Sequence, residues 1–201
     1  MKYTIIGLAI SVLGFTACNS NVDNKSADKQ DMSQHEMKDM NMHDSSSENP
    51  AIKASESINI NSIITYYLQM KNAFTKDNDK EAATAGNEMV KAFAAFNKTS
   101  LSADQAKIYN DIEDDAKEHA EHIGMNAGNI KHQREHFEML SKDMADLIKT
   151  FGNGGQTLYK DFCPMYNGGK GGYWISETKE IRNPYLGKAM PTCGTVKQEM
   201  K

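Results

Sequence analysis

The apolar side chains between Ile58 and Phe151 recur every three or four positions, which is the period of an amphipathic helix. This pattern predicts a first helix that ends near residues 76–78 and a second that ends near Asn97. The connections between these segments are short, so we expect consecutive helices to pack against each other in an antiparallel fashion.

The third segment of this pattern is the longest. Ser102 and Gln105 have the spacing of a capping box and mark its start. Apolar residues then follow mostly at heptad spacing, which predicts helix over residues 103–151 with a break or kink at 124–128. The predicted fold class is therefore mainly α, a four-helix up-down bundle.

After Gly152 the chain becomes rich in glycine, with short β-prone pieces that we expect to fold by packing on the bundle. The run at 167–172 is too rich in glycine to hold a helix, so the chain must turn there and can bring Cys163 back towards Cys193. Two thiols and two thioethers lie at the two ends of residues 163–193. They are soft donors suited to Cu(I) or Ag(I). They are Cys163, Met165, Met190 and Cys193. The alternative is a Cys163–Cys193 disulfide, which would stabilise the fold by about 3 to 4 kcal/mol.

The N-terminus has the form of an export signal. Lys2 precedes a short apolar run that ends at Ala17, and residues 3–17 are too few to span a bilayer comfortably. Small residues before Cys18 resemble a lipoprotein signal, in which that cysteine becomes lipid-modified. We therefore expect a mature chain in the cell envelope, anchored to a membrane by lipid and facing the periplasm or the outside.

Residues 18–57 are polar and read as a disordered tether between the lipid and the folded domain. Within this tether, four thioethers and two imidazoles fall in twelve residues: Met32, His35, Met37, Met40, Met42 and His43. Thioether and imidazole together form a ligand set for Cu(I) and Ag(I), and the tract resembles the Met/His-rich tails of exported copper-handling proteins. An acidic spacer with chance methionines is the alternative.

A polar stripe runs beside the apolar seam of the long helical segment. His119, His122 and His136 belong to it, and the first two are spaced so that they can share a metal ion. On a straight helix His136 lies about 25 Å from His119, so these two could join one site only across a sharp kink. His132 is expected to point elsewhere. A hydrogen-bonded polar seam without metal is the alternative.

Several motifs resemble a bacterial envelope domain of formally unknown function. They are Phe162-Cys163-Pro164-Met165, Tyr173 to Glu177, Ile181 to Gly187, Met190 to Gly194 and, upstream, His132 to Phe137. That domain occurs in small lipoproteins and on periplasmic adaptor subunits of heavy-metal efflux pumps. The resemblance implies an association with copper or similar soft metals, and an efflux adaptor or pump as partner.

Two function classes compete, and two others are disfavoured. The first is an envelope lipoprotein that binds Cu(I) or Ag(I) for sequestration, delivery or efflux support; the second is a structural adaptor module clasped by a disulfide. No hydrolase or redox motif is present, so we expect no enzyme, and the net charge of -4 argues against nucleic acid as a partner. The predicted organisation is a signal peptide at 1–17, the lipidated tether at 18–57, the helical bundle at 58–152 and the Cys/Met metal-binding segment at 153–201.

Overall fold

The computed structural model describes residues 59–201. The predictions for the signal segment, for Cys18 and for the Met/His tract at 32–43 lie outside these residues. Within residues 59–201, no helix combines the length and apolar character needed to cross a membrane.

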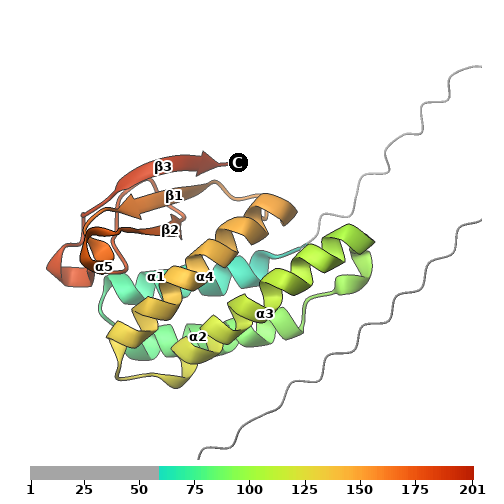
Figure 1. Ribbon diagram of the computed structural model, residues 1–201, viewed down its shortest axis with the longest axis horizontal. Helices are drawn as coiled ribbons and strands as arrows, with labels where there is room; N and C mark the ends of the chain where they lie inside the picture. Colours follow the sequence, from blue (N-terminus) through green and yellow to red (C-terminus); the bar gives the residue numbers. More distant parts are fainter. Residues whose placement is uncertain (1–58) are drawn as a thin grey trace, which may run out of the picture. The chain divides into compact units, whose positions relative to one another are not determined.

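Four long helices form the first part of the domain, as the periodicity predicted. Consecutive helices contact each other, and the sheet that follows them packs on α1 and α4 (Figure 1). The helices are α1 (Asn61–Thr75), α2 (Asp79–Ala94), α3 (Ala103–Met125) and α4 (Ile130–Phe151), with a 3-10 turn, η1 (Lys98–Ser100), between α2 and α3. Their up-down order stays a prediction.

Local sequence explains where these helices begin. Ser102 caps α3 by a complete capping box with Gln105, as expected, and Asn78 caps α2 by accepting from the backbone N–H of Glu81. Asn129 caps α4 in the same way, by accepting from the N–H of His132. Each cap satisfies a backbone donor that the first helical turn leaves without a partner.

The glycine-rich C-terminal part forms a three-stranded antiparallel sheet with strand order β2-β1-β3. Its elements are β1 (Leu158–Cys163), the short turn α5 (Tyr166–Gly169), β2 (Gly172–Ser176), the 3-10 turn η2 (Gly187–Ala189) and β3 (Thr195–Met200). In Figure 1 the sheet lies over α1 and α4, on the side away from α2 and α3. The expected packing of this segment on the helices is therefore confirmed.

One buried hydroxyl joins the helices to the sheet. Tyr67 of α1 is fully buried, and its oxygen accepts from the backbone N–H of Ile175 in β2 at 2.9 Å. The same oxygen lies 2.8 Å from the hydroxyl of Ser141 in α4, which in turn donates to the carbonyl of Phe137 at 2.7 Å. Three elements from distant parts of the sequence thus share one hydrogen-bonded chain inside the core.

Candidate metal centre

The long helical segment is interrupted by a tight turn at residues 126–129, and this turn makes α3 and α4 into a hairpin. The backbone N–H of Asn129 donates to the carbonyl of Asn126 at 3.0 Å, and Gly128 adopts a left-handed φ of 95° that favours glycine. Asp79 accepts from the N–H of Gly128 at 2.6 Å and ties the turn to α2. Residues equally far from the turn therefore meet across the hairpin.

Four histidines gather on this hairpin. Ring nitrogens of His122, His132 and His136 all lie within 4.8 Å of one another. The Nδ1 atom of His119 lies 3.3 Å from Nδ1 of His136. We call these four residues the histidine cluster. A metal with bonds of 2.0–2.1 Å holds its nitrogen ligands about 3.3 to 3.6 Å apart. Small side-chain rotations would therefore bring the ring nitrogens of the cluster to the separation that a metal requires.

The rings are packed closely. Those of His122 and His136 are stacked with their centroids 4.1 Å apart and an interplanar angle of 4°, and His132 meets His136 edge-on at 4.6 Å. Because a metal lies in the plane of each imidazole that binds it, the stacked pair must tilt when an ion enters. His122 is partly exposed and can make that rotation.

The electrostatics of the histidine cluster favour neutral rings. Burial, followed by the neighbouring imidazoles, lowers the pKa of His136 to about 4, and burial lowers the pKa of His119. A neutral imidazole keeps a nitrogen lone pair, which is the form that binds metals. These two rings therefore need no proton release to act as ligands near pH 7.

A carboxylate lies behind the cluster. The Oδ2 atom of Asp143 in α4 is buried without a hydrogen-bond partner and lies 3.9 Å from Nε2 of His119, while Nδ1 of His119 faces His136. Metal-binding histidines commonly turn their second nitrogen towards such a group, which orients the ring. Glu118 lies at the same distance, 3.9 Å, from Nε2 of His122, so neither carboxylate makes a hydrogen bond to its imidazole in this structure.

The hairpin corrects one expectation and meets the condition that was set for another. His132 was predicted to point away, but it belongs to the cluster, because the reversal at 126–129 places it opposite His122. The distance estimated for a straight helix does not apply, since His119 and His136 touch across the turn. The turn-forming residues Asn126 to Asn129 mark the interruption in the sequence, but they do not distinguish a kink from a reversal.

The polar stripe that was expected to run through these histidines also includes Asn126, Asn129 and Gln133, and these amides have structural roles. Gln133 is fully buried, and its side chain donates to the carbonyls of Asp79 and Ile123 at 3.0 and 2.9 Å. Asn126 donates to the carbonyl of His122. The alternative of a hydrogen-bonded polar seam thus holds for these amides, whereas the histidines make a separate cluster.

The four sulfur residues of the C-terminal segment have a different environment. Cys163 and Cys193 are both free, and their Sγ atoms lie 3.3 Å apart. Met165 and Met190 are exposed at the surface. The predicted return of Cys163 to Cys193 is therefore present; whether all four residues bind one ion stays a prediction.

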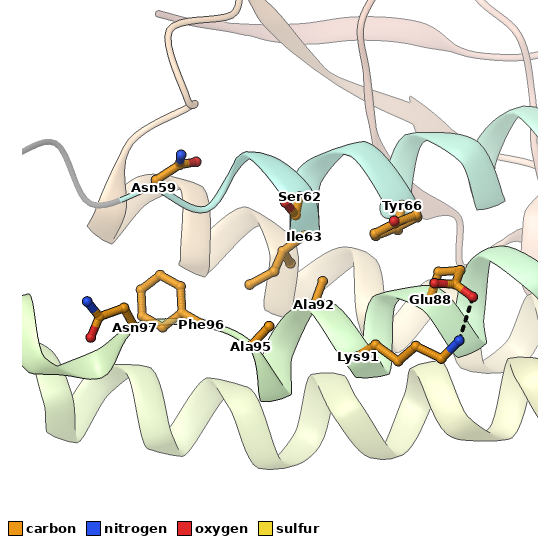
Figure 2. Close-up of a pocket in the computed structure, with 10 residues that line it drawn as sticks. All are labelled: Asn59, Ser62, Ile63, Tyr66, Glu88, Lys91, Ala92, Ala95, Phe96 and Asn97. Carbon is orange, nitrogen blue, oxygen red and sulfur yellow. Dashed lines mark hydrogen bonds and ion pairs between the residues drawn. The ribbon is translucent and has the colours of Figure 1, made fainter.

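A surface groove between α1 and α2 offers no comparable chemistry (Figure 2). Its lining includes Asn59, Ile63, Tyr66 and Phe96, and its two charged side chains, Lys91 and Glu88, pair with each other at 2.7 Å. Their charges are thus neutralised within the groove, as Figure 2 shows, and the histidine cluster remains the stronger candidate.

Comparisons with known proteins agree with this description without adding an activity. Neither the curated proteins nor the solved structures gave a match. Residues 63–156 match the model of a family described as a protein of unknown function (DUF3347). The matched stretch contains all four residues of the histidine cluster and ends before Cys163. Residues 63–156 therefore form a domain of formally unknown function, as the motifs had indicated.

Proposed function

We propose that this protein is a lipoprotein of the cell envelope that binds copper, for sequestration, delivery or support of efflux. The observation that carries the proposal is the histidine cluster, in which ring nitrogens from both helices of the hairpin converge within 4.8 Å. Imidazole suits copper, zinc and nickel, and among divalent first-row metals copper binds most tightly to a given site.

The thioether donors favour copper over zinc. Thioethers suit Cu(I) and Ag(I), and the chain carries them in the tract at 32–43 and at Met165 and Met190, whereas thiolates such as those of Cys163 and Cys193 also bind zinc. The lipoprotein-like segment that ends at Cys18 supports an envelope location with a lipid anchor. The resemblance of the C-terminal motifs to extensions of efflux adaptors supports a heavy-metal efflux adaptor or pump as partner.

The test compares copper binding by the mature chain and by a variant with His122, His132 and His136 replaced by asparagine. Electron paramagnetic resonance of bound Cu(II) should show several nitrogen ligands in the wild type and fewer in the variant, which keeps His119 and the two histidines of the tract at 32–43. A competition titration should show weaker binding already for H132N, by at least the roughly 10- to 100-fold that the loss of an outer-shell partner costs. The exposed pair K107Q and K149Q, on the same two helices, is the matched control and should change neither measurement.

Two results would overturn the proposal. The first is an unchanged copper spectrum and affinity in the triple variant, which would remove the cluster from copper binding. The second concerns the identity of the metal, measured by elemental analysis of protein isolated from envelopes. If zinc alone accompanies the protein from copper-supplied cells, the cluster is a zinc site.

A second candidate function has one observation in its favour. The close approach of Cys163 and Cys193 is also what a disulfide needs, and a disulfide-clasped module could dock on an efflux partner without binding metal. Such a module would keep its partner after the triple histidine substitution and lose it when the C-terminal segment unfolds. A pull-down with both variants separates the two functions.

A further inference from the structure

The Cys163–Cys193 pair shares no residue with the histidine cluster, and it combines a buried cysteine with a partly exposed one. Cys163 ends β1 and is fully buried, whereas Cys193 lies in the loop before β3 and is partly exposed. Their Sγ atoms lie 3.3 Å apart without a bond between them. The surrounding fold therefore holds two thiols together in their reduced form.

The side chain of Asn183 positions Cys193 without help from a sulfur–sulfur bond. Asn183 is fully buried; its backbone N–H donates to the carbonyl of Pro191 at 2.8 Å, and its side-chain amide donates to the carbonyl of Cys193 at 2.6 Å. Gly194, which follows Cys193, has a φ of 150°, and a side chain at this position would collide with the ring of Trp174. The loop thus presents Cys193 to Cys163 by its own hydrogen bonds.

Two thioethers flank the thiols and remain accessible. Met165 is 58% exposed and Met190 is 39% exposed, whereas Met70, Met89 and Met144 are fully buried in the core. The backbone N–H of Cys193 donates to the carbonyl of Met190 at 3.2 Å, and the backbone N–H of Met165 contacts the Cys193 sulfur. The backbones of both methionines therefore adjoin Cys193, and their side chains are accessible to solvent.

We propose that Cys163 and Cys193 form a redox-gated site for a monovalent soft ion, Cu(I) or Ag(I), which binds to the dithiol form and not to the disulfide form. With sulfur–metal bonds of about 2.3 Å, sulfurs lie about 3.8 Å apart around a tetrahedral ion and about 4.6 Å apart around a linear two-coordinate ion, so binding requires the present pair to widen. A disulfide of about 2.05 Å requires a contraction. The reduced pair lies between these two states and can reach either.

Both steps balance. On metal binding each thiol releases its proton to solvent, and two sulfur–metal bonds form. On oxidation, the Cys193 thiolate attacks an incoming small-molecule disulfide and expels one thiol, giving a mixed disulfide. The Cys163 thiolate then displaces the second thiol and closes the internal bond. Two thiols of the chain are oxidised while one external disulfide is reduced to two thiols, and Cys193 acts first because it is the accessible one.

The experiment uses the full chain with Cys18 replaced by serine in all samples, so that a thiol count reports only on the pair. Ag(I) is the probe because it binds thiolates without changing oxidation state here. Native mass spectrometry and competition titration compare the anaerobically reduced chain with the chain oxidised by glutathione disulfide. We expect one tightly bound Ag(I) more per reduced chain than per oxidised chain, and full recovery after treatment with dithiothreitol.

Variants locate the effect and separate it from the histidine cluster. C193S should lose the additional Ag(I), and comparing the two redox states of the wild-type pair gives the same information without any risk of misfolding. The triple histidine variant should keep the additional Ag(I), so a failure of the copper proposal leaves this result intact. M125L, which removes an exposed thioether elsewhere, is the matched control and should change nothing.

Two results would overturn the proposal. Equal Ag(I) binding by the reduced and oxidised chains would show that the thiols are not ligands. A disulfide that persists in the folded chain under dithiothreitol, and opens only when the chain is unfolded, would make the pair a permanent structural bridge.

Discussion

Replacing Tyr67 by phenylalanine tests how the sheet is attached to the helices. The substitution keeps the ring, including its stacking on Phe137 with centroids 5.1 Å apart, and removes only the hydroxyl. That oxygen accepts from the N–H of Ile175 and contacts the hydroxyl of Ser141 in a fully buried environment. The variant therefore isolates one polar atom shared by α1, α4 and β2.

The cost follows from what is left unpaired. The N–H of Ile175 loses its acceptor inside the core, and a buried unsatisfied donor costs about 1 to 3 kcal/mol. Ser141 still donates to the carbonyl of Phe137, so the loss of its contact with Tyr67 adds about 0.5 to 1 kcal/mol. We expect the free energy of unfolding to fall by about 1.5 to 4 kcal/mol and the melting temperature by roughly 5 to 15 °C.

Urea unfolding of Y67F and wild type measures this difference, and the m-value should stay the same because the folded state buries the same surface. Y66F, at the partly buried neighbour of Tyr67, is the control and should stay within about 0.5 kcal/mol of wild type. Hydrogen exchange should show faster exchange at the amide of Ile175. If Y67F unfolds at the same urea concentration as Y66F, the hydroxyl does not hold the sheet to the helices.

Three further predictions concern other parts of the chain. E177Q should lower the free energy of unfolding, measured in urea, by about 2 to 4 kcal/mol, because Lys71 is 1% exposed and would lose the carboxylate that it contacts at 2.6 Å. The double variant K71M/E177Q removes the buried charge as well and should recover most of that loss. C18S should appear in the soluble envelope fraction on immunoblots, and a C18S product that still requires detergent would contradict lipid anchoring. Deleting residues 31–44 should lower the number of copper ions per chain in elemental analysis and leave the tightest site intact; an unchanged copper content would exclude the tract as a ligand.

The local features of the sequence were enough to predict the helices. Periodic apolar side chains and short-range caps such as Ser102 with Gln105 depend on residues three or four positions apart, so they can be read without the tertiary structure. The turn after Gly152 and the return of Cys163 to Cys193 could be predicted for a similar reason. A glycine-rich run disfavours a helix and permits the left-handed backbone conformations that a reversal uses, as at Gly168, Gly169 and Gly171.

The composition of the candidate sites could be predicted in part. The spacing of His119 and His122 on one helix face placed two rings together, because a helix repeats every 3.6 residues. The sulfur donors were identifiable by their chemistry alone. The geometry that joins His132 and His136 to the first two rings was not accessible, since it depends on whether the interruption near residue 126 kinks the helix or reverses it.

By itself, then, the sequence determined the helical segments, their caps, the glycine-rich turn and the types of donor atom that the chain carries. Only the tertiary structure decided which donors meet. The turn at 126–129 placed His132 opposite His122, and the hydrogen bonds of Asn183 placed Cys193 against Cys163. The physical reason is that side-chain spacing along a helix is a local property, whereas contacts across a hairpin or a sheet depend on the direction in which the chain returns.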